Sequence, residues 1–198
     1  MSTGWDGNSI PYREEKMLDM NGIMDYLTLN WSGKGWVHIS DQLRDAIAGR
    51  MWEIYSNAFE HSGSGIGVYS CGQHFPGRNE LLLSVVDFGQ GIPAKIRTYL
   101  GRDPRAQDLS AAACLHWAFK RGNSTCPQGV ARGLGLDLLK EFVRINHGKL
   151  EIYSNDGYAI VSKDGEQYEN RNISFEGTVV HITLRCDEKL YLFRDETE

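Results

Sequence analysis

The chain has 198 residues, of which 41% are hydrophobic, and it carries a formal net charge of -5 with a pI near 5.7. This length and composition predict one compact globular domain, and the negative charge argues against nucleic acid or an anionic membrane surface as the main partner. No apolar run approaches the roughly 20 residues that cross a bilayer, and the polar N-terminus is unlike a signal peptide. We therefore expect a cytoplasmic protein that does not bind membranes.

The first predicted elements are a lead-in segment and a long helix. Residues 1–12 are expected to be flexible, and residues 14–29 have a mixed pattern that a short helix would explain. From Ser40, a predicted N-cap, apolar residues recur at helical spacing until Ser62 and Gly63 break the pattern, which predicts an amphipathic helix. The apolar residues of this helix are Leu43, Ile47, Met51, Ile54, Ala58 and Phe59.

Two predicted strands and an irregular segment follow this helix. Residues 65–71 and 81–86 have strand patterns, and the second strand is rich in branched apolar residues and leads directly to Asp87. Residues 94–132 mix Pro, Gly, Asp and Ser, with two short helical patterns at 96–100 and 109–119. Such a segment is typical of an insertion or a lid.

The last third of the chain predicts a second long helix and three strands. The helix is expected at 133–146, the strands at 150–154, 158–162 and 178–185, and Asn155-Asp156-Gly157 is predicted to be a hairpin turn. This order of elements predicts an α/β (α+β) two-layer sandwich, with a mixed, mostly antiparallel sheet and helices on one face.

The four cysteines are widely scattered, without a Cys-x-x-Cys pair or a histidine at metal-ligand spacing. They are Cys71, Cys114, Cys126 and Cys186. This spacing predicts reduced structural thiols rather than a zinc site.

One face of the first long helix carries a polar cluster. Glu53, Asn57, Glu60 and His61 are spaced by four, three and then one residue, so that a helix brings them onto one side. The Asn57 amide oxygen could serve as a ligand of Mg²⁺, and a carboxylate one turn away, Glu53, could orient or deprotonate an attacking water or hydroxyl. The alternative interpretation is an ordinary solvated helix face.

Two glycine-containing motifs complete the pattern. Asp87, followed by Gly89 and Gly91, places a carboxylate at a strand end near a tight turn, where it could accept a hydrogen bond from an exocyclic amine such as that of adenine. The alternative is a simple strand-terminating turn. Gly133 and Gly135 stand where a loop enters a helix, a position that favours phosphate, although neither a P-loop nor a Rossmann fingerprint is present.

In their order and spacing, these motifs resemble the ATP-binding domain of the GHKL superfamily, which includes gyrase-type, chaperone-type and mismatch-repair ATPases, sensor histidine kinases and anti-sigma-factor kinases. The resemblance spans residues 40–186 and implies a Bergerat fold that binds ATP and Mg²⁺. We accordingly divide the chain into a lead-in at 1–39, the ATP-binding domain at 40–186 and a C-terminal tail at 187–198.

The resemblance also implies roles for single residues. Asn57 would bind Mg²⁺, and Glu53 would be the catalytic general base. Asp87 would recognise the adenine amino group, with Thr178 of a late Gly-Thr pair beside it. The other residues assigned to the nucleotide site are Gly89, Gly91, Ile92, Gly133, Leu134, Gly135 and Leu136.

The subfamily is indicated by two further segments. Residues 118–122 resemble the lid of sensor histidine kinases, where Lys120 and Arg121 could contact phosphates or simply be solvated. The spacing of Glu53, Asn57 and His61, in contrast, resembles the corresponding motif of anti-sigma-factor serine kinases. Autophosphorylation on histidine is not expected, because His38 is the sole histidine before the long helix and has no acidic neighbour.

Two classes of function fit this pattern. In the first, the domain hydrolyses ATP or transfers its γ-phosphoryl group to a partner protein, which the resemblance suggests is a STAS-like antagonist, a sigma-factor-like protein or a response-regulator-like protein. In the second, ATP only switches a binding surface for a partner. The polar segment 163–176 is a candidate partner contact, and a homodimer is possible among such relatives.

Overall fold

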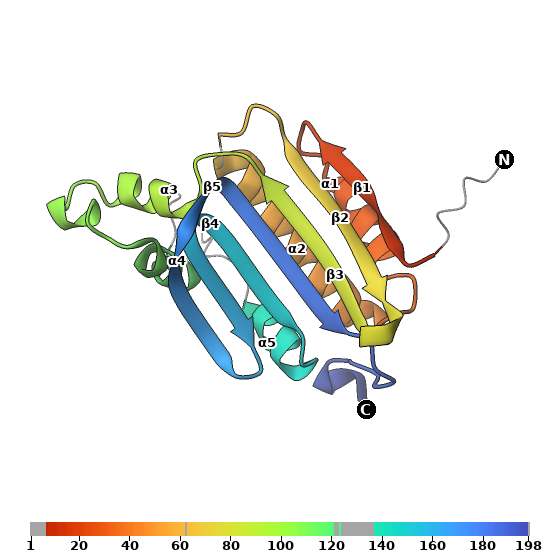
Figure 1. Cartoon of the computed structure of the whole chain (residues 1–198). Coiled ribbons are helices and arrows are strands. Elements are labelled where there is room, and N and C mark those ends of the chain that lie inside the picture. Colours follow the sequence, from red (N-terminus) through yellow and green to blue (C-terminus); the bar gives the residue numbers. More distant parts are fainter. Residues whose placement is uncertain (1–6, 62, 121–122, 124–136, 198) are drawn as a thin grey trace.

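The computed structural model describes residues 7–61, 63–120, 123 and 137–197, which form a two-layer α/β sandwich (Figure 1). The sheet has five strands in the order β1-β2-β3-β5-β4, and each neighbouring pair is antiparallel. Its strands are β1 (Ser9–Glu15), β2 (Val68–Phe75), β3 (Glu80–Asp87), β4 (Lys149–Ser162) and β5 (Gly165–Arg185). The predicted fold class is therefore confirmed.

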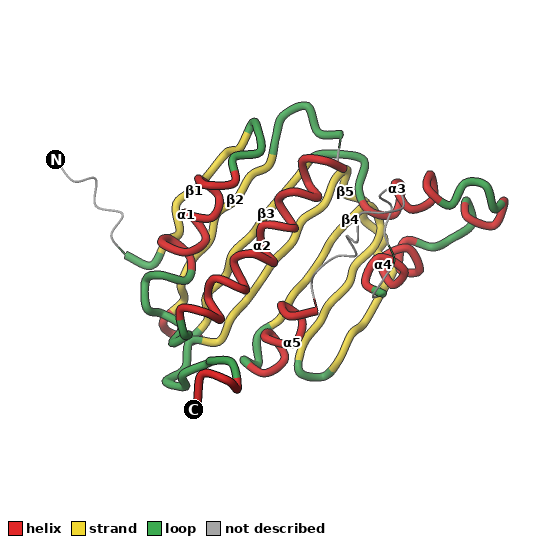
Figure 2. The backbone as a smooth tube through the Cα atoms, turned by 180° about the vertical axis from the view of Figure 1, so that it is seen from behind, coloured by secondary structure: helices red, strands yellow, loops and turns green. Residues whose placement is uncertain are grey.

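Helices α1, α2 and α5 pack on one face of the sheet, whereas α3 and α4 lie to one side of it (Figure 2). The α-helices are α1 (Met20–Asp25), α2 (Asp41–His61), α3 (Ile92–Tyr99), α4 (Ala111–Phe119) and α5 (Asp137–Ile145). A π-helical turn covers Tyr26–Trp31, and short 3-10 helices cover Pro76–Arg78, Pro104–Ala106 and Arg194–Thr197. Among the described residues, no helix combines the length and apolar character that a bilayer crossing requires.

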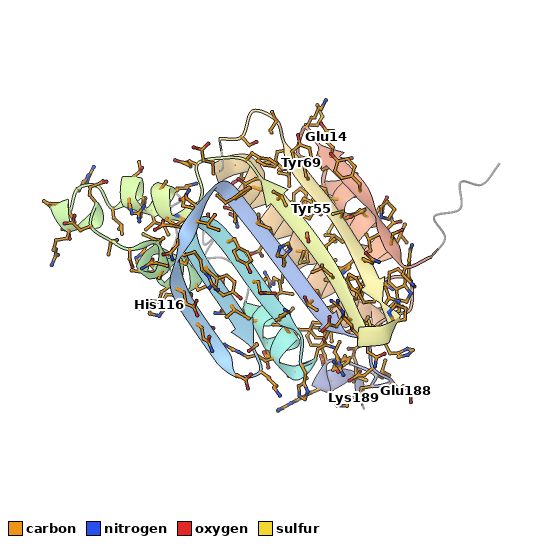
Figure 3. All side chains as sticks on the ribbon, viewed as in Figure 1. Glu14, Tyr55, Tyr69, His116, Glu188 and Lys189 are labelled. Atoms are coloured by element: carbon orange, nitrogen blue, oxygen red, sulfur yellow. The ribbon has the colours of Figure 1, made fainter. Side chains whose placement is uncertain are left out.

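Helix α2 confirms the amphipathic helix predicted after Ser40. The Ser40 hydroxyl caps it by accepting a hydrogen bond from the backbone N–H of Leu43 at 3.2 Å. The inward residues of α2, including Ile47 and Met51, are buried in one core together with the inward residues of β3. Figure 3 shows the labelled Tyr55 between the helix and the sheet, where it is fully buried. The apolar face of α2 and the inward-facing residues of β3 thus pack together in one core, as their sequence periodicities indicate.

The N-terminal segment differs from the prediction. Residues 9–12, expected to be flexible, belong to strand β1, which pairs with β2, and the expected helix at 14–29 begins only at Met20. Ile10 is buried against the sheet, and the Tyr26 hydroxyl donates to the Pro11 carbonyl at 2.9 Å. The prediction was wrong because an edge strand is defined by its pairing with a distant strand, which local periodicity does not contain.

The predicted hairpin turn at Asn155-Asp156-Gly157 is also wrong. Strand β4 continues through these residues to Ser162, and the chain reverses between Ser162 and Gly165. Asn155 has a φ of 51°, and the β4–β5 register is irregular on either side of it. Asn tolerates this left-handed backbone, which here bends a paired strand instead of closing a two-residue turn.

Beyond this bend, the outer halves of β4 and β5 form a hairpin that contacts α4 and α5. The polar segment 163–176, a candidate partner contact in the sequence, supplies the turn and the first half of β5. Glu166 pairs with Lys140 at 3.1 Å and with Arg144 at 2.8 Å, both on α5. Figure 3 labels His116 of α4, whose ring lies 4.9 Å from that of Tyr168 between the centroids. The hairpin therefore ties both helices to the sheet.

The described cysteines agree with the predicted free thiols. Cys71, Cys114 and Cys186 form no disulfide, and Cys126 lies outside the described residues. Helix α5 covers part of the helix predicted at 133–146, whose first residues also lie outside the described part of the chain.

Replacing Ser40 with alanine should lower the free energy of unfolding by about 1 kcal/mol, because it removes the N-cap of α2. The Ser40 hydroxyl also donates to Glu196 at 2.8 Å, so the substitution also removes a contact with the C-terminal segment. Urea denaturation measures the effect. Ser174→Ala, at an exposed position, is the matched control and should leave the unfolding free energy within about 0.5 kcal/mol of wild type. Equal losses in both variants would contradict the capping role.

Candidate functional site

The candidate site lies at the end of the sheet where both α2 and β3 finish. These two elements run to the same end of the molecule, as Figures 1 and 2 both show, and the chain then continues from β3 towards α3 and α4. Asp87 is the last residue of β3, and Asn57 stands one turn before the end of α2. The first two predicted motifs are thus brought to a common end of the fold.

Asp87 occupies an inward position of its strand. Burial alternates along β3, so that Leu81, Leu83, Val85 and Asp87 face the helices. Asp87 is 6% exposed, and its carboxyl group accepts a hydrogen bond from the backbone N–H of Gly89 at 3.0 Å. Burial raises the pKa of Asp87 to about 6, although hydrogen bonds from Gly89 and Thr178 favour the charged form. Near neutral pH the group remains an acceptor.

A row of three polar residues crosses neighbouring strands at this end of the sheet. Thr178 of β5 is paired with Asp87 on one side and with Ser154 of β4 on the other. The Ser154 and Thr178 hydroxyl oxygens lie 3.0 Å apart, and all three residues are buried. The three strands therefore carry inward polar groups at the same level of the sheet, and these groups satisfy one another.

The turn after β3 depends on glycine at two places. Gly177 has a φ of 124°, and a Cβ there would lie 2.1 Å from the Asp87 carbonyl oxygen. Gly91 has a φ of 81°, and a Cβ there would lie 2.6 Å from Nδ2 of Asn155. A side chain at Gly177 would clash with the backbone of Asp87, and one at Gly91 would displace the Asn155 side chain.

Sequence reasoning missed Ser154 and Asn155 as site residues. The backbone N–H of Ile92 donates to the Ser154 hydroxyl at 2.8 Å. The Asn155 side chain donates to the Gln90 carbonyl at 3.0 Å and accepts from the N–H of Ala94 at 3.3 Å. A signal was present, because Ser154 follows Leu150 and Ile152 in the inward alternation of β4, where a polar residue needs a partner.

The polar face of α2 is partly engaged within the helix itself. Arg50 pairs with Glu53 at 2.6 Å, and the Ser56 hydroxyl donates to Glu60 at 3.0 Å. The half-buried Asn57 side chain, in contrast, makes no hydrogen bond to any described residue. The amide is thus available to a ligand, and the His61 side chain lies outside the description.

The predicted phosphate-binding groups are largely outside the described residues. Lys120 follows α4 and is exposed. Arg121 and the motif Gly133, Leu134, Gly135 and Leu136 are not among the described residues, so their contacts stay predictions.

An antiparallel sheet with helices on one face, ending in a buried carboxylate beside a glycine turn, has the organisation of a GHKL-type ATP-binding domain. A family model described as histidine kinase-, DNA gyrase B- and HSP90-like ATPase matches residues 32–188. The chain belongs to this family and is an ATP-binding domain of the GHKL type. Comparison with curated proteins gives no match.

Replacing Asp87 with asparagine should stabilise the protein at pH 8, by about 1–3 kcal/mol, because it removes a charge that burial disfavours. The folded-state pKa of Asp87 is raised, so the charged carboxylate lowers the stability of the folded protein. This loss of stability is absent below about pH 4, grows as the pH rises towards about 6 and is complete above that value. Urea unfolding from pH 4 to pH 8 checks this window. Asp164→Asn, in the exposed β4–β5 turn, is the control and should show no such pH dependence. A less stable Asp87→Asn protein at pH 8 would contradict the expectation.

Proposed function

We propose that the domain binds Mg-ATP at the common end of α2 and β3 and transfers the γ-phosphoryl group to water or to a hydroxyl group of a partner protein. The observation that carries the proposal is the buried Asp87 carboxyl, held by Gly89 and Thr178 at the end of β3. A buried acceptor fixed in one orientation is suited to recognising an amino group.

On the base side, Asp87 accepts a hydrogen bond from the adenine amino group, and Thr178 keeps the carboxylate in place. The glycine turn through Gly89 and Gly91 lets the backbone approach the base closely. Ile92, which begins α3, lines the same turn and is half-buried. These residues select the nucleotide.

On the phosphate side, the Asn57 amide oxygen fits Mg²⁺, because it is free of other described partners and such ions take few protein oxygens beside phosphate oxygens. The ion would neutralise charge on the phosphates. The backbone of Gly133, Leu134, Gly135 and Leu136 and the side chains of Lys120 and Arg121 would hold the phosphate oxygens.

Glu53 acts as the general base of the transfer. The nucleophile oxygen forms a bond to the γ-phosphorus while the bond from that phosphorus to the bridging oxygen breaks, and ADP leaves with the electron pair. The Glu53 carboxylate accepts the proton of the water or hydroxyl nucleophile. When the nucleophile is a hydroxyl, the partner is a protein substrate of the STAS-like, sigma-factor-like or response-regulator-like kind.

A second candidate is an ATP-gated switch without turnover, in which bound ATP changes the affinity for a partner protein. The Arg50–Glu53 ion pair favours this candidate, since the guanidinium occupies a carboxylate oxygen at 2.6 Å and competes with the nucleophile proton. The side chains of the pair are 44% and 31% exposed, so the contact can exchange with solvent.

Two substitutions separate nucleotide binding from turnover. Asp87→Asn should abolish ATP binding measured by titration calorimetry, because the amide presents a donor where an acceptor is needed. Glu53→Ala should retain ATP affinity within a few-fold but reduce turnover by about 10²–10⁴-fold, the usual contribution of a general base. ATP labelled on the γ-phosphate follows the transfer.

Glu141→Ala, an exposed carboxylate of α5, is the matched control and should change neither quantity. Unchanged ATP binding by Asp87→Asn would overturn the site assignment. Release of labelled phosphate that depends on Glu53 supports the enzyme, whereas bound and intact ATP in both the wild type and Glu53→Ala, without and with a partner, supports the switch.

A further inference from the structure

The turn between β3 and α3 is held by side chains of β4, a strand that is far from it in sequence. Ile92 and Ala94, at the start of α3, donate their backbone N–H groups to Ser154 and Asn155. These are N–H groups of a first helical turn, which the helix itself leaves without partners. Ser154 and Asn155 therefore supply the N-terminal caps of α3 from another strand, since Gly91 at the cap position has no side chain to do so.

Ser154 connects this helix start to Asp87. Its hydroxyl accepts from Ile92 and lies 2.9 Å from the Gly177 carbonyl and 3.0 Å from the Thr178 hydroxyl. Its single hydrogen serves one of these two acceptors, and the Thr178 hydroxyl is in turn bonded to the Asp87 carboxyl. When Ser154 donates to Thr178, a continuous path of hydrogen bonds runs from Ile92 to Asp87, the two ends of the turn.

Asn155 holds the middle and the far end of the same turn. Its amide nitrogen donates to the Gln90 carbonyl at 3.0 Å, and its amide oxygen accepts from Ala94 at 3.3 Å. Gly91 packs directly against the amide group, as the 2.6 Å approach of its hypothetical Cβ indicates. The left-handed φ of 51° at Asn155 is the backbone geometry from which the side chain makes both contacts.

We propose that Ser154 and Asn155 are positioning residues of the nucleotide site, which clamp the Asp87–Ile92 turn in the conformation that receives adenine. This proposal rests on the function proposed above for the same site. Both side chains are hydrogen-bonded to the backbone of this turn. They act by fixing Gly89, Gly91 and Ile92, so that binding does not have to order a loose turn.

Asn155→Gly is the informative variant, because glycine accepts the left-handed φ and removes both amide contacts without backbone strain. ADP with Mg²⁺ should bind this variant about 5- to 30-fold more weakly, the expected effect of losing two hydrogen bonds that order the turn. Amide exchange followed by NMR should show faster exchange at Ala94 in Asn155→Gly and at Ile92 in Ser154→Ala, with the core amides of β3 unchanged.

Asn79→Gly is the matched control. Asn79 has the same left-handed backbone, with a φ of 52°, but is exposed at the opposite end of β3. It should bind ADP like the wild type and leave the exchange of Ile92 and Ala94 unchanged.

Wild-type ADP affinity in Asn155→Gly, or weaker binding without faster exchange at Ala94, would overturn the clamp. Asn155 is half-buried and Ser154 is fully buried. The Asn155→Gly variant therefore keeps the test valid even if Ser154→Ala does not fold. Failure of the wild type itself to bind ADP would instead contradict the proposed function, and the exchange of Ile92 and Ala94 would then decide the clamp alone.

Discussion

The site depends on the buried row that Asp87, Thr178 and Ser154 form across three neighbouring strands. The three residues lie side by side at inward positions of the sheet: Asp87 ends β3, whereas Ser154 and Thr178 lie within β4 and β5. An isolated carboxyl in this position would be costly, and the neighbouring hydroxyl and backbone N–H groups reduce that cost. The antiparallel register of β3, β5 and β4 aligns the row. A change in the pairing of these strands would therefore also separate the residues of the site.

The turn that follows Asp87 is anchored on both faces of the sheet. On the helix side, Asp87 bonds to Gly89 and Thr178. On the opposite side, Phe88 lies against the rings of Tyr69 and Phe175, with both centroid separations at 5.6 Å. Figure 3 labels Tyr69 on this side of the sheet. Asp87 thus faces the candidate site, while the next residue, Phe88, holds the backbone of the turn on the opposite face of the sheet.

The outer hairpin of β4 and β5 adds a second constraint. Its root is the bend at Asn155, which contacts the turn, and its body carries Glu166 and Tyr168, which contact α5 and α4. The partly buried Lys140 between Phe119 and Glu166 is satisfied by both the aromatic ring and the carboxylate. The same hairpin therefore holds α4, α5 and the turn that follows Asp87.

The sequence by itself determined the elements whose signals are local. The cap at Ser40, the helical spacing of α2, the alternation of β3 and the order of the glycine motifs predicted the fold class, the family and the position of Asp87. These signals can be read from the sequence because helix and strand periodicity reflect burial of one face, whichever element packs against that face.

Only the tertiary structure decided the features that depend on distant pairing. Strand β1 exists because β2 offers it an edge, and Asn155 bends a strand rather than closing a hairpin because β5 pairs with β4 on both sides of it. The role of Ser154 and Asn155 at the turn rests on hydrogen bonds that span about 60 residues of chain. No local pattern encodes such contacts, since they arise from the register of strands that meet only after folding.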